Sequence, residues 1–102
     1  MTDEGKEKTG GVTEWKNEGE RFEIIEVAKS TMIGILGINF RAQFAEKQKE
    51  NPNIEKLNYL KEERERLYAE QQQISFDDKE ALQRYIKKYS PIIKTDFKKD
   101  DE

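Results

Sequence analysis

Apolar residues between positions 20 and 50 are spread around most of a helix circumference. At about 100° per residue, they cover a wider arc than the apolar stripe of an ordinary surface helix. The apolar positions are Phe22, Ile24, Ile25, Val27, Ala28, Met32, Ile33, Ile35, Leu36, Ile38, Phe40, Ala42, Phe44 and Ala45. The pattern predicts one long helix that other elements must cover from several sides.

The narrow remaining face of this helix carries small residues in its middle. Ser30, Gly34 and Gly37 have the spacing that lets helices pack closely. They either form a docking groove for a second copy or partner, or let another helix of the same chain come near. Because each interior glycine costs a helix roughly 1 kcal/mol relative to alanine, Thr31–Phe40 could instead be extended or break the helix.

A second helix is predicted from Pro52 to about Gln73. Proline disfavours helical geometry in the preceding residue and suits the first helical position, so Asn51 would be the cap. One side of this helix has the alternating three-four spacing of a coiled-coil seam, with polar interruptions. The seam positions are Leu57, Leu60, Arg64, Leu67, Gln71 and Ile74.

A third helix is predicted over residues 76–89, with Ser75 as its N-cap and Ser90-Pro91 as its stop. Its apolar face carries Leu82, Tyr85, Ile86 and Tyr89. An apolar arm (91–97) and a polar tail (98–102) should follow, and residues 1–11 should form a disordered tail. The predicted fold is an all-α helical hairpin or three-helix bundle, with one domain over residues 12–97 and disordered termini, that self-association could complete.

The composition excludes several kinds of catalytic and metal site, but it does not indicate a particular function. Only 33% of the residues are hydrophobic and 40% are charged, against roughly 45 to 50% and about 25% in ordinary domains, so a monomer would have a thin core. The chain contains neither cysteine nor histidine, which removes thiolate sites and the commonest metal ligand and general base. We therefore expect no catalytic residues, metal or cofactor. An enzyme using carboxylates alone is the remaining catalytic hypothesis.

Charge and targeting signals give further expectations. The formal charge is −3, yet Arg84, Lys87, Lys88 and Lys94 form a basic region near two tyrosines, which makes them candidates for nucleic-acid contact. The longest apolar stretch is too short to span a bilayer, which takes about 20 residues. The acidic, polar N-terminus does not resemble a secretory signal, so a cytoplasmic location is expected.

The excess of apolar surface on the first helix leads to the functional hypothesis. Two shorter helices with narrow stripes should not cover it, so the chain is predicted to be a protein-interaction module of the assembly-factor, inhibitor or adaptor type, binding a protein partner or a second copy. The predicted interface residues are Ser30, Met32, Ile33, Gly34, Gly37, Phe40, Arg41 and Phe44. The alternative is a small oligomeric nucleic-acid-associated regulator that uses the basic region.

Overall fold

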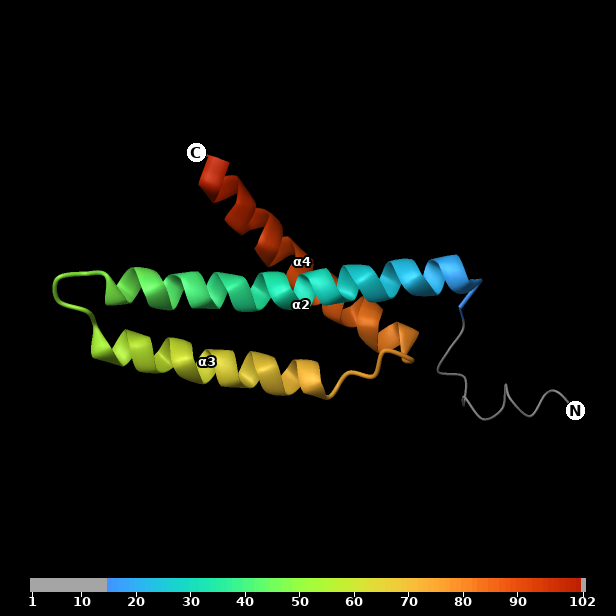
Figure 1. Ribbon diagram of the computed structural model, residues 1–102, viewed down its shortest axis with the longest axis horizontal. Coiled ribbons are helices and arrows are strands. Elements are labelled where there is room, and N and C mark those ends of the chain that lie inside the picture. Colours follow the sequence, from blue (N-terminus) through green and yellow to red (C-terminus); the bar gives the residue numbers. More distant parts are fainter. Residues whose placement is uncertain (1–14, 102) are drawn as a thin grey trace, which may run out of the picture.

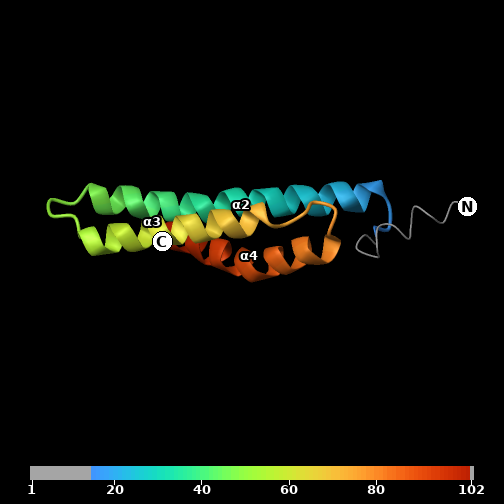
Figure 2. The same cartoon turned by 90° about the horizontal axis from the view of Figure 1, so that it is seen from below.

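The computed structural model describes residues 15–101, and the side chains as far as residue 98. Within that part the chain forms three helices and no strand: α2 (Glu18–Lys47), α3 (Ile54–Gln72) and α4 (Lys79–Asp101). Helix α3 runs back antiparallel beside α2, and α4 crosses α2 near its middle (Figure 1). Seen from below, α3 and α4 lie on the same side of α2 (Figure 2). The all-α prediction is confirmed, while the predicted disordered tail (1–11) lies outside the described residues.

Helix α2 is continuous through both of its interior glycines. It begins after Asn17, whose Oδ1 accepts a hydrogen bond of 2.8 Å from the Glu20 backbone N–H, and its first turn is acidic, as the helix dipole favours. The alternative in which Thr31–Phe40 is extended or breaks the helix is therefore wrong. Packing on two other helices outweighs the propensity cost of the glycines.

Helix α3 starts later than the sequence indicated, because its cap is Asn53 and not Asn51. The Asn53 Oδ1 accepts a 3.0 Å hydrogen bond from the Lys56 backbone N–H, so Pro52 precedes the helix. The Asn53 backbone N–H is held in turn by Glu46 Oε2 at 2.8 Å. This bond joins the end of α2 to the start of α3, and capping signals in the sequence do not indicate it.

Helix α4 also starts later than the sequence indicates, at Lys79 instead of residue 76. Asp78 caps the helix through a 3.0 Å bond from the Ala81 backbone N–H to its Oδ1. Ser75 Oγ instead accepts a 3.1 Å bond from the Asp77 backbone N–H in the turn before the helix. Ser75 is thus not the helix cap, and residues 76–78 precede the helix.

The predicted stop at Ser90-Pro91 is wrong, since α4 continues through Pro91 to Asp101. The predicted apolar arm (91–97) and the start of the predicted polar tail (98–102) are therefore helical. Proline removes a helical hydrogen bond and crowds the preceding turn. Two contacts beyond it hold the last turns against α2: Ile93 packs on Gly34, and Arg41 pairs with Asp96 at 2.6 Å.

The apolar core lies where the three helices meet. Met32 and Ile35 from α2 pack with Tyr85 and Tyr89 from α4, and partly buried residues of all three helices surround them. Gln71 of α3 joins this cluster, because its Nε2 donates to the Met32 carbonyl oxygen at 3.2 Å and to the Tyr85 hydroxyl at 3.0 Å. Hydrogen bonds from Gln71 therefore connect α3 to both α2 and α4 within the core.

The far half of the α2–α3 hairpin combines two buried leucines of α3, Leu57 and Leu60, with polar contacts. Asn39 Nδ2 donates to the Leu60 carbonyl oxygen and to Glu63 Oε1, both at 2.9 Å, while Gln43 Nε2 donates to Asn39 Oδ1 at 2.7 Å. Asn39 and Gln43 are both buried, so the bonds to Leu60 and between the two amides form away from water, while the bond to Glu63 is partly buried. Buried polar groups cost free energy unless they are paired, so this network opposes any other register of the two helices.

Candidate interaction surfaces

Four large apolar side chains form an exposed line along α2, which we call the α2 stripe. Their exposed fractions are 67% for Phe22, 72% for Ile33, 64% for Phe40 and 59% for Phe44. At 100° per residue their positions fall within about 40° of one another on the helix surface. The stripe extends for about 33 Å at 1.5 Å per residue.

The stripe remains exposed because α2 uses a different side for internal packing. The buried positions of α2 lie three or four residues apart, as in a helix seam, with the buried Thr31 beside them: Ala28, Met32, Ile35, Asn39, Gln43 and Glu46. Since α3 and α4 both lie on one side of α2 (Figure 2), neither covers the other side. The wide apolar arc therefore divides into one buried and one exposed line.

The structure brings only some of the predicted interface residues together. Ile33, Phe40 and Phe44 lie on the α2 stripe, and Gly37 lies beside it. A Cβ atom added at Gly37 would meet only the Arg41 side chain of its own helix, at 3.5 Å. The surface at Gly37 is therefore open to a partner.

Two other predicted interface residues are used within the chain. Met32 is part of the buried core. A Cβ atom added at Gly34 would lie 3.0 Å from Ile93 Cδ1, so this glycine allows the close approach of α4. Of the two interpretations of the small-residue face, contact within the chain is the one that applies at Gly34.

The remaining two predicted interface residues lie on the α4 side of α2. Ser30 is exposed and lines a groove between α2 and α4, and Arg41 is exposed but paired with Asp96. Neither residue belongs to the stripe: Ser30 borders the groove, and Arg41 holds the end of α4 through Asp96.

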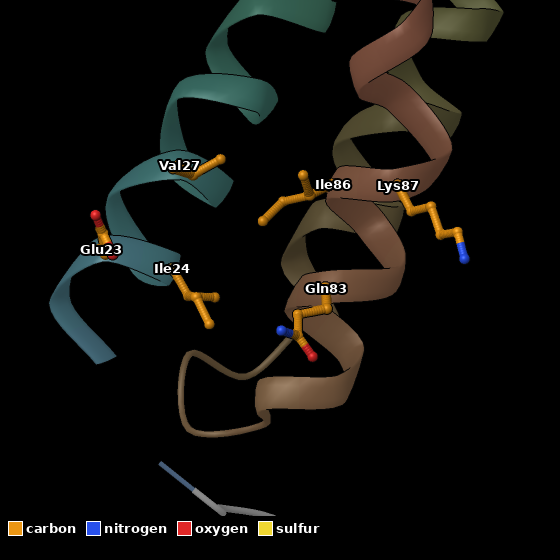
Figure 3. A pocket seen from close by; sticks show the side chains of 6 residues that line it. All are labelled: Glu23, Ile24, Val27, Gln83, Ile86 and Lys87. Carbon is orange, nitrogen blue, oxygen red and sulfur yellow. The ribbon is translucent and has the colours of Figure 1, made fainter. Parts of the chain in front are cut away.

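The groove between α2 and α4, which we call the α2–α4 groove, has two adjoining lobes. The first has a volume of about 460 Å³, and Figure 3 shows its lining: Glu23, Ile24, Val27, Gln83, Ile86 and Lys87. The second, of about 390 Å³, is lined by Glu26, Val27, Ser30, Thr31, Ser90, Ile93, Lys94 and Phe97. Val27 belongs to both lobes, so they are continuous. Sequence reasoning missed this groove because it depends on α4 crossing α2 and continuing past Pro91.

The basic residues proposed for nucleic-acid contact are divided between two sides of α4. Arg84 pairs with Glu80 at 3.8 Å, and Lys88 pairs with Glu70 at 3.1 Å, whose hydrogen bond raises the pKa of Lys88. Lys87 and Lys94 instead line the α2–α4 groove. The four cations therefore do not form one patch.

The tyrosines of this region are core residues. Tyr85 and Tyr89 are buried with ring centroids 4.6 Å apart. Burial raises the pKa of Tyr85 to about 12, although the hydrogen bond from Gln71 acts in the opposite direction. Burial also raises the pKa of Tyr89, whose hydroxyl donates to Glu70. Their rings are not available for stacking on bases.

Among the residues that the structure describes, Glu46 has the carboxylate whose pKa is shifted furthest, and its role is structural. The backbone N–H of Asn53, followed by the Lys49 ammonium group at 2.9 Å, lowers the pKa of Glu46 from 4.5 to about 2. It is therefore ionised at neutral pH and occupied by the turn that joins α2 to α3. Among residues 15–101, no group of three or more acidic side chains is placed to hold a metal ion.

Comparisons with known proteins add no family to this description. No protein-family model matches the chain, and no curated protein or solved structure is significantly similar to it. In the part of the chain that the structure describes, no helix is both long and apolar enough to cross a bilayer.

Proposed function

We propose that this chain is a protein-interaction module, of the assembly-factor, inhibitor or adaptor type, that binds through the α2 stripe. The observation that carries the proposal is the alignment of four mostly exposed apolar side chains along one helix. Burying apolar surface stabilises a complex by about 25 cal/mol per Å², and contiguous exposed apolar surface is typical of interaction sites.

The C-terminal half of the stripe is the better part for a partner to contact. Ile33, Phe40 and Phe44 follow one another at helical spacing there. Between Phe22 and Ile33 the line is interrupted by the half-exposed Glu26–Lys29 pair, whose charged atoms are 3.7 Å apart. A rigid apolar helix of this kind suits contact with another helix, from a second copy or from a different protein.

The kinds of side chain in this protein support a role in binding more than a role in catalysis. The chain has no histidine or cysteine, and the carboxylate with the largest pKa shift, Glu46, binds a turn and two lysines. The alternative of a nucleic-acid-associated regulator has less support, because its tyrosines are buried and two of its four cations pair with carboxylates.

The test compares a stripe variant with a matched variant on α3. Phe40→Ser with Phe44→Ser removes exposed aromatic area from the stripe, and Tyr59→Ser with Tyr68→Ser removes it from α3, where the exposed fractions are 56% and 52%. Sedimentation over a concentration series measures self-association. Quantitative capture from the native host measures partners, and circular dichroism checks that both variants remain helical.

Two patterns of result separate the possibilities. Loss of an assembly or of a captured protein in the stripe variant, with retention in the α3 variant, would support the proposal. A monomer that captures the same proteins with and without the stripe would contradict it, as would an assembly that only the α3 variant disrupts.

A further inference from the structure

The α2–α4 groove combines an apolar floor with rims of opposite charge. Ile24 and Val27 of α2 face Ile86 of α4 in the first lobe (Figure 3), and Ile93 and Phe97 continue the apolar lining in the second. The lining residues of α4, from 83 to 97, rise about 21 Å, or about four turns of a helix, and those of α2, from 23 to 31, rise about 12 Å.

The charges on the two rims are segregated by helix. Glu23 and Glu26 line the groove from α2, while Lys87 and Lys94 line it from α4. No residue in the described part of the chain forms an ion pair with Glu23, Lys87 or Lys94, and Glu26 has only the 3.7 Å contact with Lys29. The rim charges are therefore available to a ligand.

We propose that the α2–α4 groove binds one amphipathic helix of another protein, with an apolar stripe, one basic edge and one acidic edge. The basic edge would lie along Glu23 and Glu26, and the acidic edge along Lys87 and Lys94. The apolar stripe would cover Val27 and Phe97, which are 46% and 69% exposed in the free chain. This is the helix-in-groove mode of recognition, with charge complementarity selecting the ligand.

Other occupants fit the groove less well. A nucleic acid or an anion would meet the acidic rim, which repels phosphate. The N-terminal segment of this chain has only Met1 and Val12 as apolar residues among positions 1–14, so it cannot supply an apolar stripe four turns long. None of the four side chains of the α2 stripe lines this groove, so this proposal stands independently of the proposed function.

The test uses three synthetic helical peptides with the same apolar stripe. One has lysines along one edge and glutamates along the other, the second has lysines along both edges, and the third has glutamates along both. The mixed-edge peptide should bind more tightly than either like-charged peptide, by about fivefold to tenfold if each rim pair contributes as exposed ion pairs do. Isotope-edited NMR on the full chain should place the peptide at Val27 and Ile86.

Variants of the rim lysines test whether charge complementarity selects the peptide. Lys87→Glu with Lys94→Glu makes both rims acidic, so the preference should shift to the peptide with lysines on both edges. Lys61→Glu with Arg66→Glu makes the same change of net charge on α3 and should leave the order of the peptides unchanged. The same order of affinities in wild type and rim variant would overturn the charge complementarity.

A floor variant tests the site itself. Val27→Glu should abolish binding of the mixed-edge peptide, whereas Ile54→Glu, on an α3 side chain that is 63% exposed, should not. Equal binding by both variants would overturn the proposal. So would a dimer of the chain alone that Val27→Glu dissociates, because the occupant would then be a second copy. Phe40→Ser with Phe44→Ser should leave peptide affinity unchanged, which separates this proposal from that of the α2 stripe.

Discussion

Gly34 and Gly37 lie almost one turn apart on α2 and should respond in opposite ways to a larger side chain. At Gly37 an added Cβ atom makes one ordinary contact, at 3.5 Å with Arg41 Nη1. Alanine is favoured over glycine in a helix interior by about 1 kcal/mol. Gly37→Ala should therefore raise the free energy of unfolding by about that amount.

At Gly34 the same gain in propensity is opposed by a close contact. The added Cβ atom would lie 3.0 Å from Ile93 Cδ1 and 3.6 Å from Ile93 Cγ1, so the isoleucine must move. Gly34→Ala should be less stabilising than Gly37→Ala. A leucine would push α4 away from α2, and overpacking of this kind typically costs about 1–3 kcal/mol.

Urea unfolding followed by circular dichroism measures all of these variants, with Gly37→Leu as the matched control for Gly34→Leu. A change of 1 kcal/mol corresponds to a shift in Tm of about 4–8 °C for a domain of this size. Equal stability of Gly34→Leu and Gly37→Leu would refute the reasoning, because it would mean that α4 does not lie against Gly34. A loss of stability in Gly37→Ala would refute the assignment of an open surface there.

Three further predictions concern buried polar groups. The pKa of Glu46 is lowered to about 2, so its contribution to stability is complete above pH 4.5 and disappears as the pH falls towards 2; Glu46→Gln should flatten this acid limb in urea titrations, and an unchanged limb would contradict it. The pKa of Tyr85 is raised from 10 to about 12, so its contribution is complete below pH 10 and is lost as the pH rises towards 12; Tyr85→Phe should flatten the alkaline limb, and a limb as steep as in wild type would exclude this cause. Asn39→Ala removes the donor to Leu60 and should lower the free energy of unfolding by about 1–3 kcal/mol, measured by urea unfolding, with a neutral effect counting against the buried network.

Periodicity in the sequence located the helices because each has a face that packs on the others. It identified Leu82, Tyr85 and Tyr89 as one face of α4, and all three are buried. It also indicated that two shorter helices could not cover α2. The exposure of Phe22, Ile33, Phe40 and Phe44 agrees with that expectation.

The helix boundaries could not be predicted because they depend on contacts between one helix and the next. Asn51 and Asn53 are both good caps, and the choice between them depends on the bond from the Asn53 N–H to Glu46. Likewise, Pro91 is a strong local stop signal, but packing of Ile93 on Gly34 keeps the chain helical beyond it.

The buried polar residues of α2 were also missed, although the sequence contained a signal. Asn39, Gln43 and Glu46 continue the seam spacing of Ala28 and Ile35. Polar residues at the end of an apolar helix are usually solvated, so this spacing alone does not indicate their burial. The α2–α4 groove had no local signal, since its two sides are distant in the sequence.

The two ends of the α2–α3 hairpin are held by different numbers of helices, so the molecule should open from one end. Near the turn, α2 and α3 contact each other through Leu57, Leu60 and the bond from Asn39 to Leu60, whereas Met32 and Ile35 also pack on side chains of α4. A contact between two helices buries less apolar surface than the junction of three, so it opens at a lower cost in free energy. Backbone amides near the turn should therefore exchange with solvent first, while the three-helix junction remains closed and keeps α2 and α3 together.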